Sequence, residues 1–281
     1  MICFDTYSYG FLKLLKENKK CKLSFAGALL TILVLATYWN TPKNEFVEFD
    51  DYEYVVYNNL VRSPGDSYLK DLFTTPVRSN YHPLTILSYR INNNNCKTCP
   101  VGISPKPFIK GNITLHLLNS ILVLILIFLL FDRSIIISFL VAALFAVHPM
   151  HVESVAWISG RKDVLFTFFF LGGLIAYVKY LQDNRWKYLW LIFSFILFVM
   201  SCLSKATAVV FPVIIILINF WAHTKGEEKP VPGFLKNAFS SKNLLFLVPF
   251  FAVSVFIGLM AYRIQSGENF LGLLNMDQNP G

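Results

Sequence analysis

Seven long apolar runs alternate with polar segments along this chain of 281 residues. An α-helix needs about 17–25 mostly apolar residues to cross the hydrocarbon layer of a bilayer. The runs lie near residues 23–39, 113–131, 134–150, 164–181, 188–204, 206–222 and 244–262. The pattern predicts an all-α polytopic membrane protein with about seven transmembrane helices.

The longest polar segment, residues 40–112, follows the first apolar run and is rich in aromatic residues, which predicts a structured loop. Two stretches in it, Ser67–Phe73 and Pro83–Ile91, space their apolar residues at helical intervals. They predict two short helices lying on the membrane surface. We therefore divide the chain into a lead, 1–22, and a membrane domain, 23–281, whose first external loop is 40–112.

Composition agrees with the membrane prediction, since 55% of the residues are hydrophobic, 15% are charged and the mean hydropathy is +0.52. The net charge of +8 would suggest a nucleic-acid partner in a soluble protein. Here the basic residues concentrate before the first run and in the short segments after alternate runs, as topology signals do. We expect a cytoplasmic N-terminus, an external first loop, the lipid bilayer as partner and no nucleic acid.

The five cysteines provide no disulfide framework. Cys96 and Cys99 on the external loop are compatible with a local disulfide or with half of a metal site. The sequence has no second closely spaced pair, so a zinc ribbon is disfavoured.

The predicted topology gathers acidic, basic and imidazole side chains on the external face. Such a mixture suits transfer from an amphiphilic donor, because a lipid-phosphate leaving group needs cations and an acceptor hydroxyl needs a carboxylate base. The candidates are Asp50, Asp51, His82, Arg90, His148, His151, Glu153, Arg161, Asp163 and Lys205.

Each candidate also has a structural interpretation. Adjacent aspartates in a loop usually face water or cap a helix, and the imidazoles of His148 and His151 are more often polar contacts between helices than metal ligands. Lys205 stands between two short apolar runs with almost no loop, so it needs an anionic partner or a wet cavity.

Six ordered motifs together resemble the membrane portion of the transmembrane O-mannosyltransferases that carry tetratricopeptide repeats, within the GT-C superfamily. The resemblance covers about residues 23–281, and its motifs are Phe49–Asp51, Tyr81–Arg90, His116–Asn119, Leu144–Ala156, Gly160–Asp163 and Leu203–Lys205. Relative to that family, the chain is expected to lack the later spans and the repeats. It also has His82 where relatives often have Arg, and Ala206 where they often have an acidic residue.

The resemblance implies an inverting glycosyltransferase that moves a hexose such as mannose from a polyprenyl- or dolichyl-phosphate donor to a protein hydroxyl or glycan acceptor. Asp50 or Asp51 is implied as the base, with Asp51 slightly preferred, and a divalent metal is allowed but not required. The phosphate would be bound by Arg161, Lys205 and Arg90. The remaining pocket residues would be His82, His148, His151, Glu153 and Asp163.

Two other classes compete with this interpretation. A transporter or flippase of a lipid-linked saccharide would bury polar groups and broken helices at mid-membrane, and a non-catalytic membrane scaffold would need no charged site. The external face would be the ER lumen in a eukaryote and the periplasm or cell exterior in a bacterium.

Overall fold

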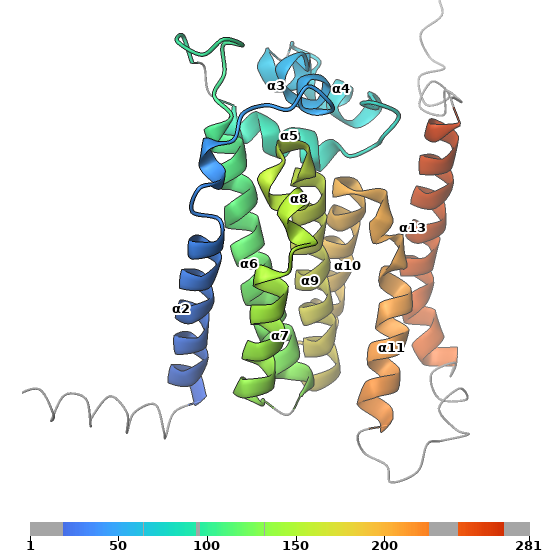
Figure 1. The fold of residues 1–281 in the computed structure, drawn as a ribbon. Helices are drawn as coiled ribbons and strands as arrows, with labels where there is room; N and C mark the ends of the chain where they lie inside the picture. The colour runs from blue at the N-terminus through green and yellow to red at the C-terminus, as the bar shows by residue number, and fades with distance from the viewer. Residues whose placement is uncertain (1–18, 64, 94–95, 132, 225–240, 267–281) are drawn as a thin grey trace, which may run out of the picture.

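The computed structural model describes residues 19–63, 65–93, 96–131, 133–224 and 241–266. Most of the predicted lead, 1–22, therefore lies outside the described residues. The described chain is a bundle of long helices with a layer of short helices and loops over one end (Figure 1). The bundle helices are α2 (Lys19–Thr37), α6 (Lys106–Leu130), α7 (Ile135–Val147), α9 (Arg161–Gln182), α10 (Lys187–Ser204), α11 (Phe211–Thr224) and α13 (Ser241–Gln265).

Five segments are long and apolar enough to cross a membrane. They are Cys21–Lys43, Lys106–Leu130, Ile158–Gln182, Lys187–Ser204 and Phe246–Gln265. The other two predicted spans form the shorter apolar helices Ile135–Val147 and Ala206–Ala222, which run beside the five. The chain is thus a multi-pass membrane protein with five full-length candidate spans and two shorter apolar helices in the described part.

The layer over the bundle comes from the predicted loop and contains α3 (Asn59–Arg62), α4 (Tyr68–Thr74) and α5 (Pro83–Asn92). Helices α4 and α5 stand where the two short helices were predicted. Helix α5 starts with a proline, whose missing N–H costs nothing in the first turn. Its buried Ile86 and Tyr89 face the bundle, and the Tyr89 hydroxyl donates to the carbonyl of Ile158 at 3.0 Å.

Helix α7 ends part of the way along its neighbour α6. The carbonyl of Ala146, at the end of α7, bonds to Nε2 of His116 at 2.9 Å, and His116 lies ten residues, or about 15 Å, from the start of α6. After a break at His148–Pro149 the chain continues as the short helix α8 (His151–Ala156) toward the loop layer. Helices α7 and α8 are therefore two parts of one broken helix.

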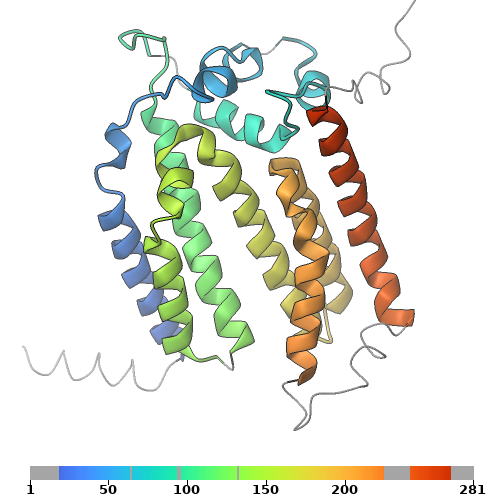
Figure 2. The ribbon, with the colours of Figure 1, turned by 45° about the vertical axis from the view of Figure 1, so that its right-hand side comes forward.

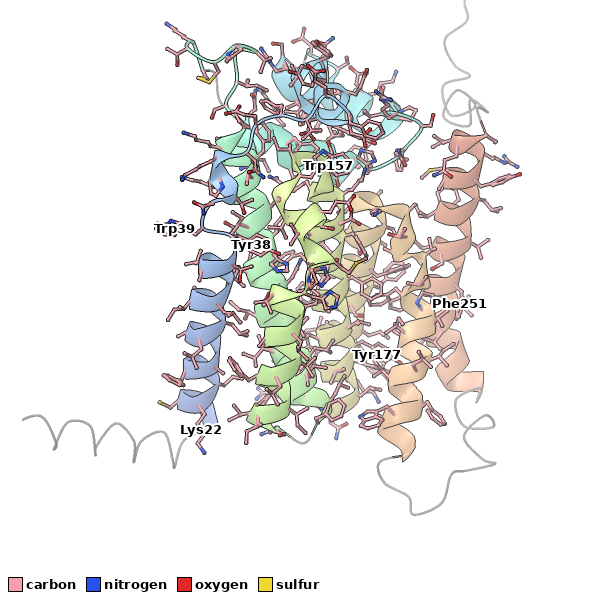
Figure 3. The ribbon with its side chains drawn as sticks, in the orientation of Figure 1. Lys22, Tyr38, Trp39, Trp157, Tyr177 and Phe251 are labelled. Atoms are coloured by element: carbon pink, nitrogen blue, oxygen red, sulfur yellow. A yellow bond between two sulfur atoms is a disulfide. The ribbon has the colours of Figure 1, made fainter. Side chains whose placement is uncertain are left out.

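The second half of the bundle packs α9 against α10 and places α11 and α13 side by side (Figure 2). A Cβ on Gly173 would lie 3.0 Å from the ring of Phe211, so the glycine allows α9 to pack closely against the start of α11. Lys22 and Trp157 stand at opposite ends of the bundle (Figure 3). Trp157 marks the loop-layer end, where the candidate residues gather.

Candidate functional site

The two adjacent aspartates have different environments. Asp51 is fully buried, and its carboxylate accepts from the Ser159 N–H at 2.9 Å, the Ser159 hydroxyl at 2.5 Å and the Val47 N–H at 3.0 Å. Burial raises the pKa of Asp51, more than these hydrogen bonds lower it. The Asp50 side chain remains 17% exposed and lies 3.6 Å from Nζ of Lys162. Asp51 therefore ties the loop to the bundle, and Asp50 is the carboxylate that another molecule can reach.

Arg161 and Lys162, the two basic residues that start α9, also have different environments. Arg161 is 2% exposed, and its guanidinium donates to Oδ1 of Asn112, to Oδ1 of Asn92 at 2.7 Å and to the carbonyl of Phe108 at 2.6 Å. It also lies over the ring of Tyr89. In this structure Arg161 thus joins α5, α6 and α9, and protein groups occupy the guanidinium to which the sequence prediction assigned a phosphate.

Gly111 makes room for the Arg161 guanidinium. A Cβ at position 111 would lie 2.5 Å from Nη2 of Arg161 and 2.6 Å from Oδ1 of Asn92. Real Cβ atoms do not approach other atoms so closely, so the arginine can cross between the helices only beside a glycine.

Lys162 points the other way, toward the loop layer. Its Nζ lies 5.2 Å from the ring centroid of Tyr54 and 5.4 Å from that of Trp157, and its side chain is 20% exposed. Two aromatic faces and the Asp50 carboxylate hold this ammonium at the surface of a cavity.

That cavity, which we call the loop-side cavity, measures about 270 Å³. Its cationic lining consists of Lys162 and Lys205, and Nε2 of His82, which is buried, has no hydrogen-bond partner among the described residues. Burial, and then the two nearby lysines, lower the pKa of His82 to about 3, so the imidazole is neutral near pH 7. The rest of the lining is Ser79, Asn80, Tyr81, Ala206, Ala261 and Gln265.

Lys205 forms the ion pair that its position required. Its Nζ bonds to Oδ1 of Asp163, both side chains are about 30% exposed, and the ammonium lies 5.9 Å from the ring centroid of Phe166. Asp163 also lines a second cavity deeper in the bundle, of about 210 Å³, together with His116 and His151. We call this the inner cavity.

The remaining predicted site residues lie apart from both cavities. Arg90 donates to the carbonyls of Val61 and Arg62 at the end of α3, and His148 and Glu153 are exposed on the bundle. Among the residues that the structure describes, no group of three or more His, Cys, Asp or Glu could hold a metal ion.

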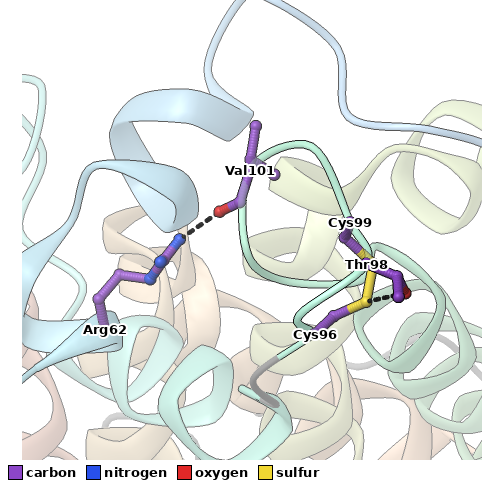
Figure 4. Close-up of a disulfide and its surroundings, with 5 residues drawn as sticks. All are labelled: Arg62, Cys96, Thr98, Cys99 and Val101. Atoms are coloured by element: carbon purple, nitrogen blue, oxygen red, sulfur yellow. Dashed lines mark hydrogen bonds between the residues drawn. A yellow bond between two sulfur atoms is a disulfide. The ribbon is translucent and has the colours of Figure 1, made fainter.

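Cys96 and Cys99 form a disulfide, which decides between the two alternatives that the sequence left open (Figure 4). The small loop around it is fixed to α3, because Arg62 donates to the carbonyl of Val101 at 2.9 Å. Thr98 and Cys99 line a third cavity of about 310 Å³ with Phe46 and Tyr52.

The sequence prediction missed Lys162 as a site residue and chose its neighbour Arg161 instead. The helical rotation of about 100° between neighbours could have separated them, because one member of an adjacent pair must point away from the other. It also left His116 and Asn119 out of the site, although two polar residues inside an apolar run signal a polar interior.

Comparison with known proteins gives one group of relatives. The chain is 30% identical over 58% of its length to "Protein O-mannosyl-transferase TMTC3" of Mus musculus, and 31% identical over 57% to "Protein O-mannosyl-transferase TMTC4" of Homo sapiens. A protein O-mannosyl-transferase of Caenorhabditis elegans is 30% identical over 69% of the chain.

These matches cover 18% of the mouse protein, 24% of the human protein and 28% of the nematode protein. The chain therefore spans about a quarter or less of the relatives it matches. No family model and no solved structure matches it. The resemblance that the motifs predicted is nonetheless confirmed: the chain is a relative of the transmembrane protein O-mannosyl-transferases.

Proposed function

We propose that the chain is a membrane glycosyltransferase that moves a mannosyl residue from a polyprenyl-phosphate donor to a protein hydroxyl, with inversion. The observation that carries the proposal is the loop-side cavity, where two lysines and an unpartnered imidazole nitrogen adjoin the reachable carboxylate of Asp50. The names of the relatives support the mannosyl group and the protein acceptor.

In this proposal Asp50 is the general base, and Asp51 holds it in place. The acceptor hydroxyl oxygen attacks the anomeric carbon while its proton passes to the Asp50 carboxylate. The bond from the anomeric carbon to the phosphate oxygen breaks, and the polyprenyl phosphate leaves with the electron pair. A single displacement of this kind inverts the anomeric centre.

Lys162, Lys205 and His82 stabilise the charge that develops on the leaving phosphate. The donor is a phosphodiester with one negative charge, and the departing monoester gains a second. Two ammonium groups in a partly water-excluded cavity favour that gain, and the neutral imidazole of His82 donates Nε2–H to a phosphate oxygen. This assignment replaces Arg161 and Arg90 by Lys162, because the guanidinium groups are bonded to other parts of the protein.

The loop layer is proposed to face the ER lumen, with the N-terminus in the cytoplasm. The described basic residues Lys22, Arg133, Arg185 and Lys187 lie at the opposite end of the bundle, as the positive-inside rule requires. The Cys96–Cys99 disulfide suits an oxidising compartment, and the relatives named above are eukaryotic.

A transfer assay tests the proposal. The 281-residue chain in lipid nanodiscs is incubated with labelled polyprenyl-phosphate mannose and a Ser/Thr peptide, and label on the peptide is measured. We expect Asp50→Asn to reduce the rate about 10²–10⁴-fold. Asp66→Asn is the matched control, because Asp66 is an exposed aspartate of the same loop and should retain the wild-type rate. Equal rates for the wild type and Asp50→Asn would show that Asp50 is not the base.

One observation favours the transporter alternative, namely the broken helix at His148–Pro149 with the polar inner cavity beside it. The same purified chain reconstituted into lipid vesicles separates the two functions. Movement of the donor between leaflets without transfer to peptide would replace the transferase by a transporter.

A further inference from the structure

The inner cavity lies where the broken helix leaves space inside the bundle. Residues of α6, α9, the end of α7 and the start of α8 line it, and it is partly open. Its polar lining comes from His116, Asn119, His151, Ser154, Asp163 and Thr167, and its apolar lining includes the rings of Phe145 and Phe166. A volume of about 210 Å³ is several times the ~30 Å³ that one water molecule occupies in the liquid.

The lining of this cavity has unused hydrogen-bond acceptors. Asn119 is 1% exposed, and its amide nitrogen donates to the carbonyl of Val164 at 2.8 Å, but its Oδ1 has no partner among the described residues. A buried acceptor without a partner is costly, so its presence indicates a ligand that donates to it.

His116 and Thr167 also have hydrogen-bond acceptor positions that are not used. The Ala146 carbonyl can only accept, so Nε2 of His116 must carry the proton in that bond, which leaves Nδ1 of a neutral imidazole as an acceptor. The Thr167 hydroxyl donates to the carbonyl of Asp163 at 2.7 Å, so its lone pairs are also left to accept. A matching ligand presents several hydroxyl donors together with a face of C–H groups for the phenyl rings, which describes a monosaccharide ring.

The inner cavity adjoins the loop-side cavity through one ion pair. Asp163 lines the inner cavity, and its partner Lys205 lines the loop-side cavity. Phe166 lines the inner cavity and lies beneath the Lys205 ammonium. A donor whose phosphate sits on Lys162 and Lys205 can therefore extend its sugar past the Asp163–Lys205 pair.

We propose that the inner cavity binds the sugar ring of the lipid-phosphate donor, with Asn119, His116 and Thr167 accepting hydrogen bonds from its hydroxyls. This inference rests on the proposed function for the phosphate, and it adds residues of α6 and of the second turn of α9 to the donor site. The broken helix at His148–Pro149 is what makes room for the ring.

The test compares two lipids of equal charge. Dissociation constants are measured in nanodiscs for polyprenyl-phosphate mannose and for the methyl ester of the same polyprenyl phosphate, which has no sugar. We expect the wild type to bind the mannosyl ester at least tenfold more tightly. Asn119→Leu should weaken binding of the mannosyl ester about 5–100-fold and leave the methyl ester unchanged, since a buried hydrogen-bonding group is removed.

Thr167→Val is the second variant, because it keeps the shape of the side chain and removes only the hydroxyl. We expect it to weaken mannosyl-ester binding about 2–10-fold. Thr114→Val is the matched control: Thr114 is also a helical threonine that bonds to the carbonyl four residues before it, at 2.9 Å, but it is exposed on α6. It should change neither dissociation constant.

The outcomes separate the two proposals. If the wild type binds both lipids equally, or if the Asn119 and Thr167 variants weaken both lipids to the same degree, the inner cavity does not hold the sugar, while the phosphate assignment stands. If neither lipid binds, or if Lys162→Met has no effect on either, the proposed function itself fails.

Discussion

The charged doublets Asp50-Asp51 and Arg161-Lys162 come from distant parts of the chain, and each is divided between two tasks. Asp51 and Arg161 are buried and fully bonded to protein groups. Asp50 and Lys162 stay partly exposed and form an ion pair with each other. The comparison teaches that proximity in sequence does not mean a shared role: one residue of each doublet holds the site together, and the other faces the cavity.

The largest expected contrast lies within the basic doublet. Arg161→Met would leave the acceptors on Asn112, Asn92 and Phe108 without donors, so we expect a loss of at least about 3 kcal/mol in the free energy of unfolding. Lys162→Met, which breaks only a partly exposed pair, should cost less than about 1 kcal/mol. Thermal midpoints of the detergent-solubilised variants measure this contrast, and equal midpoints would contradict the structural role of Arg161.

A smaller contrast is expected within the acidic doublet. Asp51→Asn replaces a carboxylate oxygen by an NH₂ group facing the N–H groups of Val47 or Ser159, and should cost about 1–3 kcal/mol. Asp50→Asn should change stability by less than about 0.5 kcal/mol, although it is the variant expected to lose transfer. Chemical denaturation of the two variants side by side checks the difference. A destabilised Asp50→Asn with an unaffected Asp51→Asn would reverse the division of roles.

The effect that is smallest at pH 7, and grows as the pH falls, is a pH dependence arising from His82. The pKa of its imidazole is about 3 in the folded protein and near 6.5 in an unfolded chain, so the unfolded state binds the proton first as the pH falls. His82 therefore makes stability decline as the pH falls from about 6.5 toward 3, by at most about 1.4 kcal/mol per pH unit.

His82→Gln should flatten that decline in thermal midpoints recorded between pH 7 and pH 4. His148→Gln removes an exposed histidine and serves as the control, whose profile should follow the wild type. If His82→Gln and the wild type lose stability in parallel, the buried imidazole is not the group responsible.

Much of the fold could be predicted from the apolar pattern, because membrane spans need long runs without charge. Helices α6, α9 and α10 lie where the runs indicated, and the short helices α4 and α5 were visible in the spacing of Leu and Ile. The break after α7 was harder to place. The run 134–150 is long enough to approach a span, but Pro149 and the bond from His116 to Ala146 end the helix inside the bundle.

The candidate site was predictable as a set of residues and not as an arrangement. The preference for Asp51 over Asp50 rested only on its position next to Tyr52, and the phosphate role of Arg161 followed from the resemblance alone. Only tertiary contacts show that Ser159 donates to the Asp51 carboxylate, and that Asn112 and Asn92 accept from the Arg161 guanidinium. Nothing in the local sequence specifies such pairings between segments about fifty to one hundred residues apart.

The bond between Asp51 and Ser159 also sets an order of events during biosynthesis. The two residues are 108 positions apart, so at about 5–20 residues per second the ribosome needs on the order of 5–20 s to supply the partner after Asp51 has been made. Tyr89 is likewise made before its partner Ile158, and Asn92 before its partner Arg161. The first loop must therefore remain undocked until the fourth apolar run starts to emerge, which gives folding factors on that side of the membrane a defined interval in which to act on it.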